Sequence, residues 1–277
     1  MQTIAYQGIP GSFSHQAACN YFGSNVKFIS EDNFEAVFEA VDTGKVEWGI
    51  LPVENSSIGV ISKVFDLLYE YDLKIQGELY LEVQHHLLAL PNTRLEDIHE
   101  IYSHPQAIEQ CSQFLSQYPN WKIVPFFDTA KSAEWVRKQG WFRYGAIASM
   151  EAAKLYDLNV LVKNIHDNPL NYTRFIIISK KQHIDRACNK ISLIIILRHE
   201  PGSLYKIVEQ FAKNEFNMLK IQSRPIMAKP FEYMFYIDFE GNLSDKKTNK
   251  MLENLEKHCA DFKIIGNYKA GIFNHIL

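Results

Sequence analysis

The last ninety residues contain the pattern that most restricts how this chain can fold. An almost uninterrupted apolar run at 191–197 is typical of a buried strand, and apolar residues at helical spacing follow Pro201 and Gly202. The elements expected from these patterns are strands at 191–197, 218–226, 232–239 and 262–268, and helices at 201–216 and 245–258. The order βαββαβ predicts a ferredoxin-like domain.

The residues before this domain alternate short apolar runs with helical patterns, which is typical of a layered α/β fold. Expected strands lie at 4–6, 48–53, 83–90, 101–103, 145–148 and 159–162, and expected helices at 14–21, 61–71, 106–118 and 150–156. Two such groups, with a return of the chain near Thr173, predict two lobes around a cleft. The polar stretch 179–186 reads as a linker. The expected domains are therefore 1–181, with lobes at about 1–80 plus 170–181 and at 81–169, and 188–277.

Composition and charge exclude several kinds of partner. A length of 277 residues is comfortable for two domains, and a net charge of -3 gives no general attraction for nucleic acid or anionic lipid. The isolated cysteines fit reduced thiols rather than a zinc site or a disulfide framework. No secretion signal is visible, and the apolar runs are too short to span a bilayer. We expect a cytoplasmic protein with neither nucleic-acid nor membrane partners.

Three loops that lead into expected helices carry hydroxyl and amide side chains, at 8–14, 52–59 and 103–106. In the third, Ser103 is a plausible N-cap with Pro105 near the first helical position. Helix N-termini offer unpaired N–H groups and a partial positive charge, so each can bind a carboxylate. Simple capping explains any one loop, but three together favour a small polyanionic ligand between the lobes.

The segment 171–175 places a hydroxyl and a guanidinium side by side before the apolar run 176–178. Thr173 can hydrogen-bond a leaving oxygen, and Arg174 can hold a carboxylate in its planar fork. The plainer alternative is the edge of a strand with a solvated arginine.

These segments together resemble the prephenate dehydratase family. The resemblance rests on 11–18, 52–59, 103–107, 128–130, 146–149 and 171–175, and covers essentially the whole chain in order. In the last domain, 202–205 and 222–225 resemble the two phenylalanine-sensing motifs of the family's ACT domain. No additional helical segment is visible before Met1, so a fused chorismate mutase is not expected.

The resemblance implies a two-lobed catalytic domain like that of periplasmic binding proteins, followed by a regulatory ACT domain. It also implies conversion of prephenate to phenylpyruvate, with loss of water and carbon dioxide, in phenylalanine biosynthesis. Neither metal nor organic cofactor is implied. L-phenylalanine is the expected allosteric effector, and a homodimer or homotetramer is the expected assembly.

The expected catalytic group is Thr173, as hydrogen-bond donor to the departing hydroxyl. Competing acids are His15, His85, His86 and His104, while Glu54 is expected to orient backbone groups rather than touch the ligand. Expected substrate-binding residues are Ser12, Ser14, Asn55, Ser56, Ser57, Ser103, Gln106, Thr129, Arg174 and Phe175. Expected effector-binding residues are His199, Gly202, Ser203, Leu204, Asn217, Met218, Gln222, Ser223, Arg224 and Pro225.

Some positions depart from the family pattern, and other functions stay open. Gln222 stands where the sensing motif usually has Glu, and Ser203 and Tyr205 replace the commoner Ala and Val. These changes bear on the strength of feedback and leave catalysis unaffected. The alternatives are an arogenate dehydratase and a non-catalytic sensor of a small anion. A chain truncated after Arg186 is expected to keep dehydratase activity and to lose its response to phenylalanine.

Overall fold

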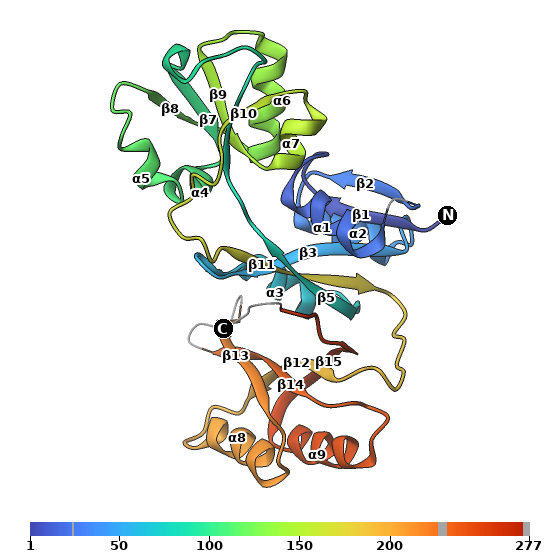
Figure 1. Cartoon of the computed structure of the whole chain (residues 1–277). Helices are drawn as coiled ribbons and strands as arrows, with labels where there is room; N and C mark the ends of the chain where they lie inside the picture. Colours follow the sequence, from blue (N-terminus) through green and yellow to red (C-terminus); the bar gives the residue numbers. More distant parts are fainter. Residues whose placement is uncertain (24, 227–231, 274–277) are drawn as a thin grey trace.

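The computed structural model describes residues 1–23, 25–226 and 232–273, arranged as an elongated molecule of three bodies (Figure 1). We call them the N-terminal lobe, the second lobe and the C-terminal unit. The N-terminal lobe lies between the other two. In the described residues, no helix combines the length and apolar character needed to cross a membrane.

The N-terminal lobe is a sheet with helices on both faces. Its strands are β1 (Thr3–Gln7), β2 (Lys27–Glu31), β3 (Trp48–Asn55), β4 (Gly59–Val60), β5 (Lys74–Glu82) and β11 (Tyr172–Ser179). Helix α1 (Phe13–Phe22) packs on one face, whereas α2 (Phe34–Asp42) and α3 (Ser62–Glu70) pack on the other. The central strands β3 and β11 are buried almost throughout, which explains their continuous apolar sequences.

The second lobe has its own five-stranded sheet in the order β10-β6-β9-β7-β8. The strands are β6 (His86–Ala89), β7 (Glu100–Ser103), β8 (Lys122–Pro125), β9 (Tyr144–Ala148) and β10 (Asn159–Val162). The helices are η1 (Leu95–Asp97), α4 (Pro105–Glu109), α5 (Ser112–Leu115), α6 (Thr129–Gln139) and α7 (Met150–Leu155).

The structure corrects several expected elements. One helix over 106–118 is wrong, because non-helical backbone at Cys111 separates α4 from α5. The sequence patterns also do not predict β2, α2, β5, β8 or α6. The strands β2 and β8 lie at sheet edges and are partly exposed, so their apolar patterns are weak. Helix α6 buries mainly small residues, which give little amphipathic signal.

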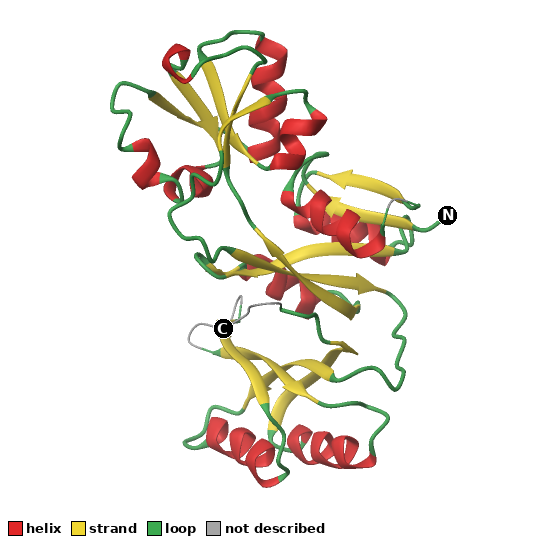
Figure 2. Cartoon of the chain, viewed as in Figure 1, coloured by secondary structure: helices red, strands yellow, loops and turns green. Residues whose placement is uncertain are grey.

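The C-terminal unit confirms the expected βαββαβ order. Its elements are β12 (Lys190–Leu197), α8 (Ser203–Lys213), β13 (Met218–Pro225), β14 (Tyr233–Glu240), α9 (Lys246–Glu256) and β15 (Cys259–Lys269). Helices α8 and α9 cover one face of the sheet, as Figure 2 shows. The other face joins Ile194, Ile196 and Tyr236 to the core formed by α2 and α3. Burial on both faces explains the uninterrupted apolar run of β12.

The sheets of the N-terminal lobe and the C-terminal unit are continuous. Strand β15 pairs in parallel with β5, which gives the order β13-β14-β12-β15-β5-β11-β3-β1-β2. A Cβ atom at Gly266 would lie 2.5 Å from the Ile75 carbonyl oxygen, so this approach requires glycine. The polar linker therefore separates the two units in sequence, but not in hydrogen bonding.

Two segments cross between the lobes, one joining β5 to β6 and one joining β10 to β11. They are hydrogen-bonded to each other where the Val83 N–H donates to the Asn171 carbonyl at 2.7 Å. Beyond this crossing β11 enters the N-terminal lobe, with Thr173 paired to Asn55 of β3 and Leu81 of β5. The start of β11 thus lies where the lobes meet. A two-lobed α/β architecture is confirmed.

Candidate active site

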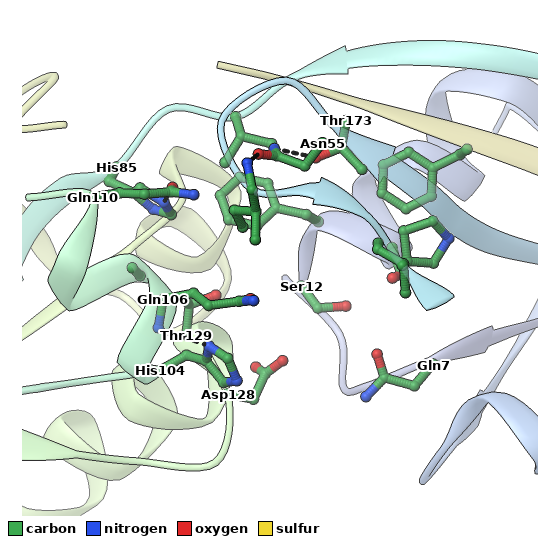
Figure 3. Close-up of a pocket in the computed structure, with 18 of the residues that line it drawn as sticks. Gln7, Ser12, Asn55, His85, His104, Gln106, Gln110, Asp128, Thr129 and Thr173 are labelled. Atoms are coloured by element: carbon green, nitrogen blue, oxygen red, sulfur yellow. Dashed lines mark hydrogen bonds between the residues drawn. The ribbon is translucent and has the colours of Figure 1, made fainter. Parts of the chain in front are cut away.

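A cavity of about 470 Å³ lies between the two lobes (Figure 3). Residues of the second lobe, including His104 and Gln106, lie on one side, and Gln7 and Ser12 of the N-terminal lobe lie opposite. The polar lining consists of Gln7, Ser12, Ser14, Asn55, His85, His104, Gln106, Gln110, Asp128, Thr129 and Thr173. The apolar lining consists of Phe13, Phe34, Pro52, Ile58, Ile61, Val83, Ala107, Phe127 and Phe175. This volume suits a small-molecule ligand.

Two helices of substantial length begin at this cavity. The α1 N-cap is Ser12, whose hydroxyl accepts from the His15 N–H at 3.3 Å. The α6 N-cap is Asp128, whose Oδ1 accepts from the N–H groups of Ala130 and Lys131 at 2.7 and 3.0 Å. The donors at the start of α6 are thus largely satisfied by a carboxylate. The start of α1 is the better seat for an anionic group.

Thr173 and Asn55 form the central hydrogen bond of the site. The Asn55 Oδ1 accepts from the N–H groups of Ser57 and Ile58, at 2.9 and 3.1 Å. These backbone donors fix the orientation of the amide, because an N–H group can only donate. The Asn55 Nδ2 therefore donates, to Thr173 Oγ1 at 2.9 Å and to Asn171 Oδ1 at 2.8 Å. Thr173 accepts this bond, so its own hydrogen remains available for a group in the cavity.

The same network continues to the second lobe. The Asn171 Nδ2 donates to Gln110 Oε1 at 2.9 Å, and His85 Nε2 lies 2.9 Å from the same oxygen. An oxygen can only accept, so His85 carries its proton on Nε2. With its oxygen occupied twice, Gln110 presents its amide hydrogens as donors at the cavity. The donor and acceptor roles in all of these hydrogen bonds follow from the backbone N–H groups of Ser57 and Ile58, which fix the orientation of the Asn55 amide.

None of the four histidines expected as competing acids is arranged as an acid for neutral pH. Burial lowers the pKa of His85 to about 4, and burial also lowers the pKa values of His15, His86 and His104. His15 and His86 do not line the cavity. The His104 Nδ1 accepts from the Gln106 N–H at 3.3 Å, as the N-cap of α4. Thr173 therefore stays the better donor among the expected groups.

The expectation that Arg174 holds a substrate carboxylate is wrong. Adjacent residues of a strand point to opposite faces, so Arg174 points away from the cavity that Thr173 lines. Its guanidinium is buried and lies 2.7 Å from both Glu78 and Asp238. Phe175, on the same face as Thr173, does line the cavity.

Three of the expected serines also lie outside this cavity. Ser103 is the last residue of β7, and its buried hydroxyl donates to the Ile147 carbonyl at 2.7 Å. It is neither the N-cap of α4, which is His104, nor part of the lining. The Ser56 hydroxyl donates to the Leu170 carbonyl at 2.8 Å. Ser56 and Ser57 line a neighbouring cavity instead.

The remaining expected residues lie in the cavity lining, and some members of the site escape sequence reasoning. Ser12, Ser14, Asn55, Gln106 and Thr129 all line the cavity.

Asn171 and Gln110 belong to the network but were not expected. Asn171 precedes Thr173 by two residues, and strand periodicity would place both on one face. Gln110 has no comparable signal, because it lies at the unexpected break between α4 and α5.

The expected effector residues do not gather at one place in a single chain. Strand register places the end of β13, at Arg224 and Pro225, beside the start of β14, near the loop after β12 that carries His199 and Gly202. Asn217 and Met218 lie at the other end of β13. The eight residues of this strand put its two ends roughly 23 Å apart. The expectation that they face the start of α8 is therefore wrong within one chain.

The inner face of β13 contacts the N-terminal lobe. The Arg224 Nη2 donates to both carboxylate oxygens of Asp66 in α3, at 2.7 and 3.0 Å. The Lys220 ammonium lies 2.7 Å from the Glu54 carboxylate. Glu54 was expected to orient backbone groups, and instead forms this ion pair. Gln222 lies between the two cations on the same face, and its Nε2 donates to the Ser223 carbonyl at 3.0 Å. Arg224 and Lys220 thus join the two units in this conformation. Within the described residues, no cluster of His, Cys, Asp and Glu could hold a metal ion.

Comparisons with known proteins identify relatives along nearly the whole chain. A sequence model described as prephenate dehydratase matches residues 4–183. A bifunctional chorismate mutase/prephenate dehydratase of Aquifex aeolicus is 35% identical, over 97% of this chain and 74% of that protein. An arogenate dehydratase/prephenate dehydratase of Arabidopsis thaliana is 37% identical, over 96% of this chain and 71% of that protein.

Solved structures give similar matches. The prephenate dehydratase of Arthrobacter aurescens, in complex with L-Phe, has a TM-score of 0.87 and 29% identity, over 96% of this chain and 89% of that one. GqqA, described as a novel type of quorum quenching acylase, has a TM-score of 0.89 and 31% identity, over 99% of this chain and 100% of that one.

Proposed function

The chain belongs to the prephenate dehydratase family, and on this basis we propose that it converts prephenate to phenylpyruvate, water and carbon dioxide. The observation that carries the proposal is the directed network at Thr173. A hydroxyl that accepts from Asn55 and faces the cavity between the lobes is arranged to donate to a leaving oxygen. The accepted bond also polarises the hydroxyl, which makes it a stronger donor.

The reaction asks little covalent chemistry of the protein. The ring C–O bond breaks and the hydroxyl leaves with its electron pair. The bond to the ring carboxylate breaks, carbon dioxide departs, and those electrons complete the aromatic ring. The net reaction consumes one proton from solvent, which turns the departing hydroxide into water. Thr173 stabilises the charge that develops on that oxygen, and the cavity holds the substrate in position.

The two substrate carboxylates need donors at separate places. We propose that the start of α1, at Ser12 to Ser14, binds one carboxylate, and that the amides of Gln106 and Gln110 bind the other. Pro52 and Phe175 provide apolar surface beside Thr173. Water excluded by this surface would otherwise stabilise the carboxylate that is lost.

Arogenate is the alternative substrate, because it differs only where an amino group replaces the keto oxygen of the side chain. The Arabidopsis relative carries both names. Purified protein incubated separately with prephenate and arogenate decides between them. Phenylpyruvate from the first, or phenylalanine from the second, identifies the substrate, and Thr173→Val serves as the inactive control. No product from either substrate would refute the proposal.

GqqA makes an acylase a third assay worth including, because its fold matches over the full chain. Release of a carboxylic acid from an acylated amine, unaffected by Thr173→Val, would identify a different reaction.

A non-catalytic sensor of a small anion would bind prephenate without turnover. That outcome would appear as saturable binding with no phenylpyruvate formed.

We also propose that the C-terminal unit makes the enzyme sensitive to L-phenylalanine. Support comes from the family and from the L-Phe complex of the Arthrobacter protein. The expected effector residues lie at both ends of β13, so a complete site would draw on a second copy of the chain. We therefore propose a homodimer or homotetramer, and sedimentation with and without phenylalanine tests this assembly. A cytoplasmic location fits the free thiols of Cys19, Cys111, Cys188 and Cys259.

A further inference from the structure

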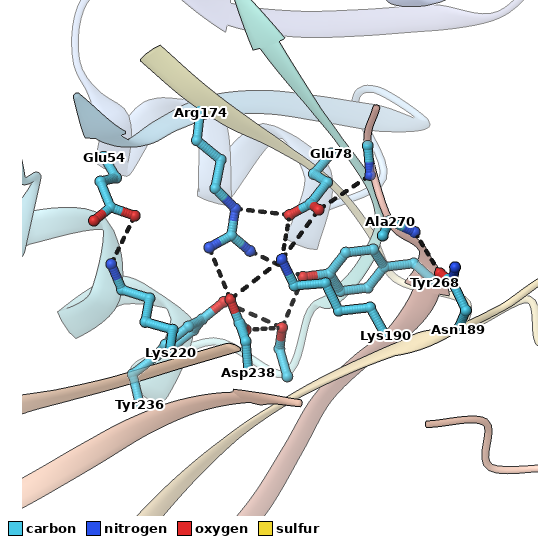
Figure 4. A network of polar contacts seen from close by, with 12 residues as sticks. Glu54, Glu78, Arg174, Asn189, Lys190, Lys220, Tyr236, Asp238, Tyr268 and Ala270 are labelled. Atoms are coloured by element: carbon cyan, nitrogen blue, oxygen red, sulfur yellow. Dashed lines mark hydrogen bonds and ion pairs between the residues drawn. The ribbon is translucent and has the colours of Figure 1, made fainter. Parts of the chain in front are cut away.

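A buried network of four charged side chains joins the N-terminal lobe to the C-terminal unit (Figure 4). Arg174 of β11 and Glu78 of β5 come from the lobe, whereas Lys190 of β12 and Asp238 of β14 come from the unit. All four side chains are at most 5% exposed. Two positive and two negative charges balance, which is what burial of charge requires.

The contacts connect all four charged groups in one continuous network. The Arg174 Nε donates to Glu78 at 2.7 Å, its Nη2 donates to the Tyr268 hydroxyl at 3.1 Å, and its Nη1 lies 2.7 Å from Asp238. Lys190 lies 3.0 Å from Glu78 and 3.5 Å from Asp238. Arg174 and Lys190 thus each contact one carboxylate of the lobe and one of the unit, and Arg174 is the cation that the lobe contributes.

The residues of this contact region are neighbours of the catalytic hydrogen bond. Thr173 pairs with Asn55 across the β11–β3 ladder, and the next ladder pair is Arg174 with Glu54. Arg174 bonds to Asp238 of the C-terminal unit, and Glu54 bonds to Lys220 of the same unit at 2.7 Å. Each partner in the Thr173–Asn55 hydrogen bond is therefore flanked by a residue held by the C-terminal sheet.

We propose that Arg174 and Glu54 are positioning residues for the reaction, through which the C-terminal unit sets the geometry of Thr173 and Asn55. This inference rests on the proposed function and adds the route by which the unit acts on it. Movement of the C-terminal sheet would shift two adjacent ladder residues, on two strands, and so change the approach of the Thr173 hydroxyl. Such a shift affects turnover more than substrate binding, because the carboxylate seats lie on other elements.

The test uses two variants that break these links separately. Arg174→Lys keeps the charge but cannot reach Glu78, Asp238 and Tyr268 together. Lys220→Met removes the partner of Glu54 at a partly exposed position, so it should fold even where the buried variant does not. We expect each to lower kcat about tenfold with KM changed less than about twofold. The response of kcat to phenylalanine should weaken in both.

Lys263→Met is the matched control. The Lys263 ammonium also joins the C-terminal unit to the N-terminal lobe, by donating to the carbonyls of Leu68, Tyr69 and Tyr71 at 2.6 to 3.1 Å. These three partners lie in α3 and in the residue that follows it, and none of them belongs to β3 or β11. We expect this variant to lose stability and keep its kcat.

A cycle with Thr173→Val separates positioning from general damage. If Arg174 and Lys220 act through the Thr173 hydroxyl, their substitution should change kcat less than about twofold in the Thr173→Val background. Equal losses in both backgrounds, or an equal loss in Lys263→Met, would overturn the inference. If Arg174→Lys is unfolded by circular dichroism, the Lys220→Met arm decides alone.

Amide hydrogen exchange provides a readout that needs no substrate. Residues 171–175 should exchange faster in Arg174→Lys and Lys220→Met, and at the unmodified rate in Lys263→Met. Unchanged exchange in the first two variants would overturn the inference. Absence of dehydratase activity in the unmodified chain would instead count against the proposed function, and the exchange result would still decide the positioning role.

Discussion

Replacement of Thr173 by Val tests the chemistry of the site most directly. Valine has nearly the same shape, so the change removes the hydroxyl and leaves the volume. One donor aimed at a developing oxyanion is worth about 10²–10³ in kcat, so we expect a loss of this size with little change in KM. Thr173→Ser keeps the hydroxyl and should stay within about tenfold of the unmodified enzyme.

The same substitution has a predictable effect on stability. The Asn55 Nδ2 donates to Thr173 and to Asn171, and both side chains around it are buried. Valine leaves one Asn55 hydrogen without an acceptor, which costs about 1–3 kcal/mol. Denaturant unfolding should show this loss in Thr173→Val and much less of it in Thr173→Ser.

The assay measures phenylpyruvate formation over a range of prephenate concentrations for all three proteins. A fall in kcat of less than tenfold in Thr173→Val would refute the reasoning, since no other change removes the proposed donor so cleanly. His104 would then be the next candidate, because it lines the cavity and is less buried than His85, the second expected acid in the lining.

Three further outcomes follow from the described contacts. Asn55→Asp replaces the amide donor with a carboxylate acceptor, so the Thr173 hydroxyl should donate to position 55 instead of into the cavity. We then expect kcat to fall about as far as in Thr173→Val, and a threefold loss or less would show that the direction of this hydrogen bond does not matter. Burial holds the pKa of His85 at about 4, below its value in the unfolded chain. The free energy of unfolding should therefore be highest above pH 6.5 and decrease by up to about 3 kcal/mol toward pH 4, because only the unfolded chain binds the proton in that range. The free energy of unfolding of His85→Gln should lack this pH dependence, and an equal dependence in both proteins would contradict the burial argument. Gln222→Glu places a carboxylate beside Lys220, where it competes with the existing partner on β3, so the midpoint of phenylalanine inhibition should shift by a coupling change of about 1 kcal/mol, and identical midpoints would assign Gln222 a packing role.

Sequence patterns predicted the elements that bury continuous apolar runs. The strand carrying Thr173 and the βαββαβ order both followed from such runs, because burial on two faces leaves few polar interruptions. The N-terminal loops Ser12 to Ser14 and Asn55 were also correctly placed at the cavity. Helix α6 was not predicted, because it buries mainly small residues and its sequence is only weakly amphipathic.

The error at Arg174 has a simple physical cause. Thr173 and Arg174 are adjacent in sequence, and adjacency suggested a shared role in the cleft. A strand separates neighbours onto opposite faces, so Asn171 rather than Arg174 lies beside Thr173. The carboxylates that pair with Arg174 belong to Glu78 and Asp238, which are distant in sequence, so no local pattern predicts these contacts.

The parallel pairing of β15 with β5 changes what a domain boundary means in this chain. A cut after Arg186 would strip β15 from β5 and leave a row of unpaired backbone groups at the new edge of the sheet. It would also leave Arg174 and Glu78 facing water without Lys190 and Asp238. We therefore revise the expectation from the sequence that this fragment keeps dehydratase activity: it should self-associate through the new edge rather than behave as an independent dehydratase.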